Sequence, residues 1–378
     1  MPESIAQRPT DAVINLDNLV SNFHASKQFI GSEVKYMAVV KANAYGHGAI
    51  ECAKRLEKEG VDWFGIAIPE EGVGLREAGI TSPILCLGSF CQGQESMVLY
   101  WQITPVIFDL DTAAALSRAA GSKIVDIHIK IDTGMGRVGI RYETAAAFAE
   151  ALRTFPNLTV TGLMTHFAAA DDPAQSEFTR LQISRFNDVC DAFAQSGHQP
   201  QLFDLANSPG AILHPDSRGN MVRLGGALYG LLDDILPDAT ERPILKPVLS
   251  LRSRVAQVKN ISKSESLGYG RTFTTKRDSL IALVPIGYAD GYSRGLSNKG
   301  RAIVSGSIVS VVGRVSMDWT LLDVTDVRNV KVNDEVIFIG SDGRNEIAAA
   351  DLARELGTIA YEITCGISAR VPRVFAER

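Results

Sequence analysis

Short apolar runs alternate with amphipathic stretches from residue 34 to residue 230. The runs are nearly continuous in apolar residues, which is typical of strands in a parallel sheet covered by helices. The stretches between them, such as residues 50–59, 144–153 and 176–194, place apolar residues at helical spacing. Eight βα units in about two hundred residues favour a closed (β/α)8 barrel over an open doubly wound sheet. The predicted strands are Val34–Lys41, Trp63–Ile68, Pro83–Leu87, Pro105–Phe108, Val125–Asp132, Thr159–Phe167, Leu202–Asn207 and Met221–Leu224.

The pattern changes after Pro243, where β-branched and polar residues alternate and Gly, Asn and Asp separate the segments. Such segments are typical of antiparallel strands. One helix is expected at Ile347–Leu356, with Gly357 ending it. We therefore expect an α/β protein: a TIM-type (β/α)8 barrel with an N-terminal extension in residues 1–243, then a smaller, mostly antiparallel β domain in residues 244–378. The predicted strands of that domain are Val248–Ile261, Leu280–Ile286, Ala302–Val312, Trp319–Val324 and Glu335–Ile339.

Composition narrows the functional classes. The 378 residues are 46% hydrophobic and 21% charged, as in an ordinary globular protein, and the net charge of −5 argues against nucleic acid or an anionic membrane as a partner. The sequence has no apolar stretch of membrane-spanning length, and its first residues do not resemble a secretory signal. Five cysteines without CxxC spacing predict reduced thiols in a cytoplasmic protein. The histidine spacing predicts no metal site.

A single lysine, Lys41, ends the apolar run at residues 36–40, and the small-residue segment 42–48 follows it at once. An ammonium group at the mouth of a buried strand loses solvation, which lowers its pKa and suits it to form a Schiff base or accept a proton. The structural alternative is a lysine that extends its charged end from a strand into solvent, and spacing alone favours that reading.

Polar and charged residues also gather where the other predicted barrel strands end. Enzymes of this fold carry their chemistry at the carboxyl ends of the strands, so these residues are expected to share one rim. Cations with a histidine and a serine suit a small dianionic ligand and a carboxylate better than they suit packing. The set comprises Lys41, Tyr45, Lys130, Asp132, Arg137, His166, Asn207, Ser208, Arg223, Gly225 and Gly226.

Two features of this rim have competing interpretations. The segment 134–139 fits the GxGxxG pattern of a dinucleotide-binding loop. No acidic residue follows about twenty positions later, where a ribose contact is expected, and Arg137 inside the turn would crowd a pyrophosphate, so a nicotinamide cofactor is disfavoured. The second feature is Lys130, which could belong to the ligand-binding set or could simply form an ion pair with Asp132 across the rim.

Several segments together resemble the alanine racemases, a family of pyridoxal-phosphate enzymes. Residues 41–48, KANAYGHG, resemble the motif around the family's cofactor lysine, and residues 130–139 resemble its KxDTGMxRxG motif. The resemblance extends from Ala12 to Val374, which is nearly the whole chain. Further matching segments are residues 205–208, 223–230, 266–273, 287–292, 313–318 and 361–363.

The resemblance implies an isomerase that interconverts L-alanine and D-alanine with two bases. Lys41 would hold pyridoxal 5′-phosphate and serve the D face of the substrate, and Tyr269 would serve the L face. Arg137 and Met317 would contact the substrate, and Lys130, often carbamylated in the family, would position Arg137. The other cofactor-binding residues implied are Tyr45, His166, Ser208, Arg223, Gly225, Gly226 and Tyr361.

The resemblance also implies a homodimer, in which Tyr269 and Met317 complete the partner's site, and a role in supplying D-alanine for peptidoglycan. Gly226 departs from the family, which usually has a larger aliphatic residue there; the backbone donor remains, but the local pocket shape is altered. A broader amino-acid racemase or a decarboxylase on the same plan is the alternative among enzymes. A pyridoxal-phosphate carrier could use the barrel alone and would not need residues 244–378.

Overall fold

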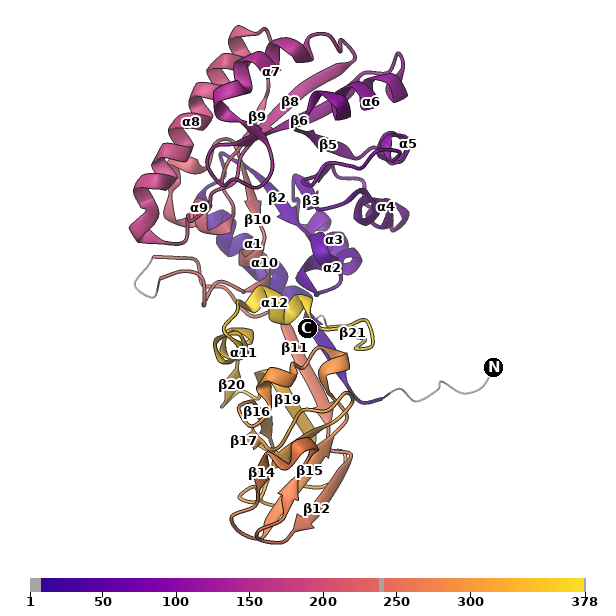
Figure 1. Ribbon diagram of the computed structural model, residues 1–378, viewed down its shortest axis with the longest axis vertical. Coiled ribbons are helices and arrows are strands. Elements are labelled where there is room, and N and C mark those ends of the chain that lie inside the picture. The colour runs from indigo at the N-terminus through magenta and orange to yellow at the C-terminus, as the bar shows by residue number, and fades with distance from the viewer. Residues whose placement is uncertain (1–7, 238–240, 377–378) are drawn as a thin grey trace, which may run out of the picture. The chain divides into compact units, whose positions relative to one another are not determined.

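The computed structural model describes residues 8–237 and 241–376. The described chain divides into two compact units. The barrel unit comprises residues 19–44, 48–237 and 241–245, and the β-rich unit comprises residues 8–18, 45–47 and 246–376. Figure 1 shows the elements of both units, coloured along the chain.

Eight parallel strands close into a ring in the barrel unit. Their hydrogen-bonded order is β2-β3-β4-β5-β6-β8-β9-β10, and β10 pairs again with β2. The prediction of a (β/α)8 barrel is confirmed, since apolar runs of this kind form strands buried on both faces. A short additional strand, β7 (Ile140–Arg141), pairs with β6. The barrel strands are β2 (Lys35–Val39), β3 (Trp63–Ile66), β4 (Ile84–Cys86), β5 (Thr104–Ile107), β6 (Val125–Asp132), β8 (Leu158–Met164), β9 (Leu202–Asp204) and β10 (Met221–Leu224).

Helices between these strands lie outside the ring, as Figure 1 shows for α3 to α8. Local signals set some of their ends; Asp109 caps α6, for example, by accepting from Thr112 N at 2.7 Å. No helix in the described ranges is long and apolar enough to cross a membrane. The helices are α1 (Leu16–Ile30), α2 (Lys41–Tyr45), α3 (Ala49–Lys58), α4 (Pro69–Glu77), α5 (Glu95–Tyr100), α6 (Leu110–Ala120), α7 (Ala145–Leu152), α8 (Ser176–Gln195), α9 (Ser208–Leu213) and α10 (Gly226–Tyr229).

Side chains fill the inside of the ring. One buried apolar cluster draws residues from six strands: Met37, Leu85, Val106, Met164, Leu202 and Met221. The ring of His128 on β6 contacts the ring of Trp63 on β3 in a tilted arrangement, with ring centroids 5.5 Å apart, although these strands are not neighbours. That contact therefore crosses the interior. The barrel is a packed core, so its chemistry is confined to the rim.

The β-rich unit is built on one large sheet with the order β12-β15-β18-β17-β16-β19-β11-β1-β21. Its pairings are antiparallel except for β1 with β21, which confirms the predicted mostly antiparallel domain. The predicted helix forms as α11, and Gly357 ends it with a left-handed φ of 70°. The elements are β1 (Asp11–Asn15), β11 (Leu249–Arg254), β12 (Gln257–Ile261), β13 (Ser266–Leu267), β14 (Phe273–Thr274), β15 (Ser279–Val284), β16 (Arg301–Val304), β17 (Ser307–Val311), β18 (Thr320–Asp323), β19 (Glu335–Ser341), β20 (Glu346–Ile347), α11 (Ala349–Leu356), α12 (Ala360–Cys365) and β21 (Arg373–Ala376).

The start of the chain differs from the sequence expectation. The described residues 8–18, expected to extend the barrel, belong to the β-rich unit instead. The reason is pairing: β1 forms an antiparallel ladder with β11 and a parallel one with β21. The β-rich unit resumes at Lys246, close to the boundary expected after residue 243.

Candidate active site

The turn that carries Lys41 has an unusual backbone. Lys41 follows β2 directly, and φ is 52° at Ala42 and 54° at both Asn43 and Ala44. A left-handed turn of L residues costs about 1–2 kcal/mol per residue, so surrounding contacts must stabilise it. Strain of this kind concentrates at functional sites.

Two side chains that the sequence analysis did not single out hold this turn. Glu71 accepts from Ala42 N at 2.6 Å through one oxygen and from Ala67 N at 2.7 Å through the other. Asn43 accepts from Ala49 N at 2.9 Å through its side chain. The end of β3 and the start of α3 are thereby tied to the lysine turn, which orients Lys41.

Residues 45–47 belong to the β-rich unit. There the ring of Tyr45 meets the ring of Tyr361, from α12, edge-on at 5.3 Å. Gly46 has a φ of 85°, and a Cβ at this position would lie 2.1 Å from the carbonyl oxygen of Thr364, so only glycine fits. Arg373 Nε donates to Gly46 O at 3.0 Å. The structure therefore brings together the two tyrosines predicted to bind phosphate.

A charged network lies in the barrel around Arg223, which is 3% exposed. Its NH1 group donates to the carbonyl oxygen of Asp204 at 3.1 Å and to the Asp204 carboxylate. Its NH2 group has three acceptors, each at 3.0 Å: Thr165 O, Leu205 O and His166 Nδ1. Among the described residues, none accepts from Nε of Arg223. This N–H is therefore available to a ligand.

Electrostatics make His166 neutral. Burial lowers the pKa of His166 well below its ordinary value, and the neighbouring charges of Arg223 and Lys130 lower it further. A guanidinium can only donate, so Nδ1 of His166 is the acceptor and Nε2 carries the proton. His166 thus orients Arg223 as a neutral partner.

Lys130, on β6, is also buried within this network. Burial lowers the pKa of its ammonium group well below the ordinary value, and Arg223 and Arg137 lower it further, while Asp204 opposes them. Within the described chain Lys130 forms no ion pair. The alternative pairing with Asp132 is absent, because Asp132 instead binds Arg141 at 3.2 Å. The amine of Lys130 is therefore driven toward its neutral form.

The loop after β6 presents Arg137, which is exposed. Asp132 fixes the loop by accepting from Gly134 N and Gly136 N, each at 3.0 Å. Gly139 has a φ of 130°, and a Cβ there would lie 2.7 Å from Asp132 N. Gly139, the last glycine of the pattern that suggested a dinucleotide loop, is therefore required by the close return of the chain to β6.

Behind this loop lies a buried polar cluster that the sequence analysis missed. Gln182 of α8 donates to Thr133 Oγ1 at 3.0 Å and to His166 O at 3.1 Å. The hydroxyls of Thr133 and Thr165 lie 2.8 Å apart. Gln182 thereby connects the Arg137 loop to the end of β8.

The predicted phosphate loop is assembled in the barrel unit. Asn207 caps α9 by accepting from Gly210 N at 3.0 Å. Ser208 Oγ accepts from Gly225 N at 2.9 Å, so its hydroxyl proton points elsewhere. Gly226 follows directly as the first residue of α10. Ser208, Gly225 and Gly226 therefore lie together, as predicted.

Tyr269 and Met317 lie at the surface of the β-rich unit, with exposed fractions of 73% and 53%. Tyr269 begins a short 3-10 turn, η4 (Tyr269–Arg271). Met317 occupies a tight turn in which Ser316 N donates to Trp319 O at 2.9 Å. Exposed large side chains of this kind are available to another surface.

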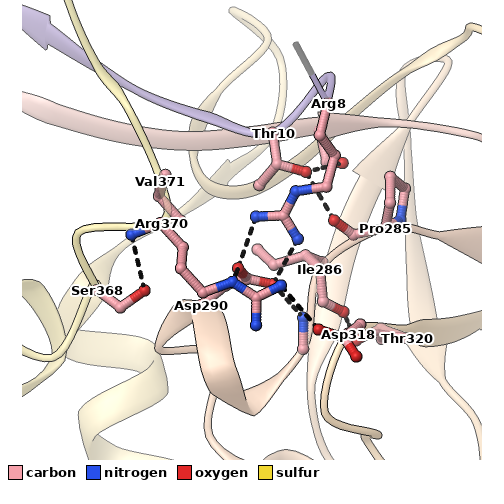
Figure 2. Close-up of polar contacts among 12 residues, drawn as sticks. Arg8, Thr10, Pro285, Ile286, Asp290, Asp318, Thr320, Ser368, Arg370 and Val371 are labelled. Carbon is pink, nitrogen blue, oxygen red and sulfur yellow. Dashed lines mark hydrogen bonds and ion pairs between the residues drawn. The ribbon is translucent and has the colours of Figure 1, made fainter.

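Figure 2 shows the polar contacts around Asp290 in the β-rich unit, including those of Arg8, Arg370 and Asp318. Asp290, fully buried, binds Arg8 through two hydrogen bonds and lies 3.5 Å from Arg370. Arg370 also binds Asp318 at 2.7 Å, next to Met317. The backbone adds a further link, since Ala289 N donates to Met317 O at 3.0 Å. The charged cluster Arg8–Asp290–Arg370–Asp318 therefore joins two turns of this unit.

Of the site residues that the sequence analysis missed, one has a recognisable signal in the sequence and two have none. Asp204 lies between the apolar pairs 202–203 and 205–206 of a predicted strand, which is a usable signal for a buried functional acid. Glu71 and Gln182 lie on helices with ordinary amphipathic patterns. Their roles depend on contacts between elements.

The fold and these residues define a class of protein: a barrel enzyme with a lysine turn and buried cations at the strand ends, followed by a β-rich unit. Comparisons identify the family. Residues 14–233 match "Alanine racemase, N-terminal domain", and residues 248–375 match "Alanine racemase, C-terminal domain".

Relatives of known name agree over almost the whole chain. The alanine racemase of Halothermothrix orenii is 42% identical over 373 residues, covering 98% of each protein. That of Geobacter sulfurreducens is 43% identical, covering 97% of each. The chain belongs to the alanine racemase family, and it is an isomerase that interconverts the enantiomers of alanine.

Solved structures are equally similar. The alanine racemase from Clostridium difficile has a TM-score of 0.91 and 38% identity, with 97% of this chain and 96% of that chain covered. The alanine racemase from Bacillus anthracis with bound L-Ala-P has a TM-score of 0.91 and 35% identity, with 99% and 96% covered. These likenesses extend over both units.

Proposed function

We propose that this chain binds pyridoxal 5′-phosphate through Lys41 and racemises alanine with Lys41 and Tyr269 as its two bases. The observation that carries the proposal is the free Nε–H of buried Arg223, whose other donors are all engaged. The residues present fit the cofactor: a lysine for its aldehyde, a cationic donor for its ring nitrogen, and hydroxyl and amide groups for its phosphate. When bound, pyridoxal phosphate supplies an electron sink that makes the α-proton of alanine acidic.

Arg223 would set the strength of that sink. A guanidinium stays protonated at any working pH, so it donates to the ring nitrogen and cannot accept a proton from it. The ring nitrogen facing Arg223 would remain unprotonated. This restrains electron withdrawal and keeps protons from being returned to the wrong carbon.

The phosphate of the cofactor would be held by five residues. The resemblance assigns this role to Tyr45, Ser208, Gly225, Gly226 and Tyr361. Two contacts support it: Ser208 lies against Gly225, and Tyr45 lies against Tyr361. Hydroxyl and amide donors are suited to a dianion. His166 would contribute by orienting Arg223.

Proton transfer requires one base on each face of the substrate. Lys41, once the substrate has displaced it from the cofactor, would move the proton on the D face. Tyr269 would move it on the L face. Because Tyr269 and Met317 are exposed on their own unit, we propose that the active protein is a homodimer in which both reach the partner's site.

Arg137 and Lys130 would form the carboxylate-binding side of the site. A planar guanidinium binds a carboxylate bidentately, so Arg137 suits the substrate. Lys130, driven toward a neutral amine, would attack carbon dioxide; the new N–C bond gives a carbamate, and one proton leaves to solvent. The carbamate would place a negative charge at this position and so position Arg137.

We further propose that the protein works in the cytoplasm and supplies D-alanine for peptidoglycan. A strain of the source organism from which the gene is deleted should then require D-alanine for growth, and a plasmid copy of this chain should remove the requirement. Growth of the deletion strain without D-alanine, with no second racemase activity in its lysate, would contradict the biosynthetic role.

The direct test uses purified protein with cofactor. Incubation with L-alanine should bring optical rotation to zero, and borohydride reduction followed by peptide mapping should fix the cofactor on Lys41. The Lys41→Ala variant should neither racemise alanine nor show a borohydride-fixed cofactor. Lys54→Ala, which alters an exposed lysine in α3, is the matched control and should keep both. A reducible linkage retained at the same peptide in Lys41→Ala would refute the assignment.

Subunit mixing tests the shared site. Tyr269→Phe should block racemisation while Lys41 still exchanges the α-proton of D-alanine with solvent deuterium. Mixing Lys41→Ala with Tyr269→Phe protein should restore part of the activity once subunits exchange. No recovery, with exchange shown by mass-tagged subunits, would place both bases in one chain.

A further inference from the structure

Asp204 is a buried acid that the mechanism above does not use. It ends β9, it is fully buried, and it binds Arg223 on the neighbouring strand β10. Its Oδ1 atom accepts from Arg223, whereas its Oδ2 atom is buried without a hydrogen-bond partner among the described residues. Burying a carboxylate with half of its acceptors unused is costly, so packing alone does not account for it.

We propose that Asp204 is a positioning residue of the active site, which fixes the guanidinium of Arg223 and offsets its charge so that the Nε–H alone meets the cofactor ring nitrogen. The inference rests on the proposed function, in which Arg223 is the partner of that nitrogen.

The geometric part of the argument concerns how many donors Arg223 has. A guanidinium offers five N–H groups in one plane. Asp204 takes both from NH1, through its carbonyl oxygen and its carboxylate. Thr165, Leu205 and His166 take those of NH2. Because NH1 and NH2 are both held, the guanidinium plane of Arg223 cannot rotate, and its Nε–H points in one fixed direction.

The electrostatic part concerns the balance of charge around the site. Because Lys130 is driven toward its neutral amine, the cations acting on this cluster are Lys41, Arg137 and Arg223, and the acids are Asp132 and Asp204. Asp132 is occupied by Arg141 and two loop amides. Asp204 is therefore the carboxylate that directly offsets Arg223. Burial raises the pKa of Asp204 to about 6, with Arg223 and Lys130 opposing the rise, so the group is ionised at neutral pH.

This arrangement has a chemical consequence. An Arg223 offset by Asp204 is a weaker electron-withdrawing donor than an unpaired guanidinium. Asp204 would therefore reduce the electron-withdrawing strength of the cofactor ring through Arg223, without contacting the cofactor. Removing its charge while keeping its shape should add about one unit of positive charge to the cluster. That change separates a charge role from a packing role.

The test is Asp204→Asn, which keeps Oδ1 as an acceptor for Arg223. Added positive charge disfavours the protonated form of the linkage between Lys41 and the cofactor. Its pKa, followed by the visible absorption of the holoenzyme against pH, should therefore fall by about one unit. Conversion of alanine to pyruvate per racemisation event should rise about tenfold, because a stronger sink prolongs the carbanion.

Asp62→Asn is the matched control. It makes the same charge change just before β3, at the opposite end of the barrel strands, where Asp62 accepts from Tyr36 N at 2.8 Å. Neither the linkage pKa nor the by-product ratio should move in this variant. If Asp204→Asn does not fold, Asp204→Ser removes the same charge with a smaller side chain that still accepts one N–H.

A second background shows whether Asp204 acts through Arg223. In Arg223→Gln protein, a buried carboxyl without its cation should be protonated at neutral pH, so adding Asp204→Asn should shift nothing further. An unchanged linkage titration and by-product ratio in folded, cofactor-loaded Asp204→Asn would overturn the proposal. So would an Arg223→Gln variant that titrates like the unaltered protein. If the proposed function itself is wrong, the unaltered protein will already show it, because borohydride will fix no cofactor at Lys41.

Discussion

Arg8 holds Asp290 through two hydrogen bonds, at 2.9 and 2.6 Å, although 282 residues separate them in the chain. The pair joins the first described residue to the turn that precedes Gly291 in the β-rich unit (Figure 2). Thr10 strengthens the attachment by donating to Pro285 O at 2.7 Å. The N-terminal segment is thus bound to this unit by a buried ion pair as well as by β1.

The first prediction is that Arg8→Ala destabilises the protein. The substitution leaves the buried carboxylate of Asp290 without its main partner, and removing one partner of a buried ion pair costs about 3–5 kcal/mol. The free energy of unfolding in urea should fall by an amount of this order. Arg277→Ala, which breaks an exposed pair with Asp326, is the control and should change it little. Equal effects of both substitutions would mean that the Arg8 pair contributes no more than a surface contact.

The second prediction concerns Arg370, which bridges Asp290 and Asp318. If the Met317 turn contacts substrate, Arg370→Ala should raise the KM for alanine about three- to tenfold and lower kcat less. The reason is that the substitution weakens substrate binding and leaves the two catalytic bases in place. Arg370 is half exposed, so unfolding should change little. Arg354→Ala removes a comparable exposed arginine and should leave KM as it was. Unaltered KM in Arg370→Ala would separate this cluster from substrate binding.

The third prediction concerns pH and His128. Burial lowers the pKa of His128 to about 3 from its ordinary 6.5, and neither ring nitrogen has a hydrogen-bond partner in the described chain. Between these values the unfolded chain binds a proton that the folded chain rejects. Stability is therefore full above pH 6.5 and falls with pH by about 1.4 kcal/mol per unit down to about 3.

His128→Phe isolates this effect, because it keeps a ring against Trp63 and removes the titration. Urea unfolding at pH 7.5 and at pH 5.5 should show a smaller loss in the variant than in the unaltered protein. The difference should be about 1.4 kcal/mol. Identical losses in the two proteins would show that His128 does not contribute to acid sensitivity.

Local sequence pattern predicted what depends on single segments. The barrel strands were readable because most are short, largely apolar runs, and Lys41 was readable because it ends one. The place of β1 was not readable, because its partners β11 and β21 lie more than two hundred residues away. Strand periodicity states which face is buried and says nothing of which strand is adjacent.

The same limit applies to the site. The left-handed turn at Ala42–Ala44 has no local signal, since alanine favours right-handed helix; it depends on Glu71 from another element. Asp204 lies inside a predicted strand, and its meaning appears only when β10 brings Arg223 beside it. The motif residues could thus be predicted, whereas the contacts that orient them needed the fold.

The last prediction replaces Arg223 with glutamate. A carboxylate facing the ring nitrogen would stabilise its protonated form by accepting a hydrogen bond from it, and the cofactor would become a stronger electron sink. The carbanion would then live longer and be reprotonated on the cofactor carbon more often. Racemisation should slow, and pyruvate should appear as a product of alanine.

Asp204 alters the design of that experiment. Arg223→Glu alone would place two carboxylates together in a buried cluster, and one of them would take a proton from solvent. If that one is the introduced glutamate, it no longer stabilises a protonated ring nitrogen. The double variant Arg223→Glu with Asp204→Asn avoids this competition, and it should release more pyruvate per racemisation event than Arg223→Glu. Arg223→Gln is the neutral control, with no negative charge to stabilise a protonated ring nitrogen, and should release less than either. Product ratios are read by chiral chromatography and a pyruvate assay on folded, cofactor-loaded protein. If all of these variants partition alanine as the unaltered protein does, Arg223 does not face the ring nitrogen.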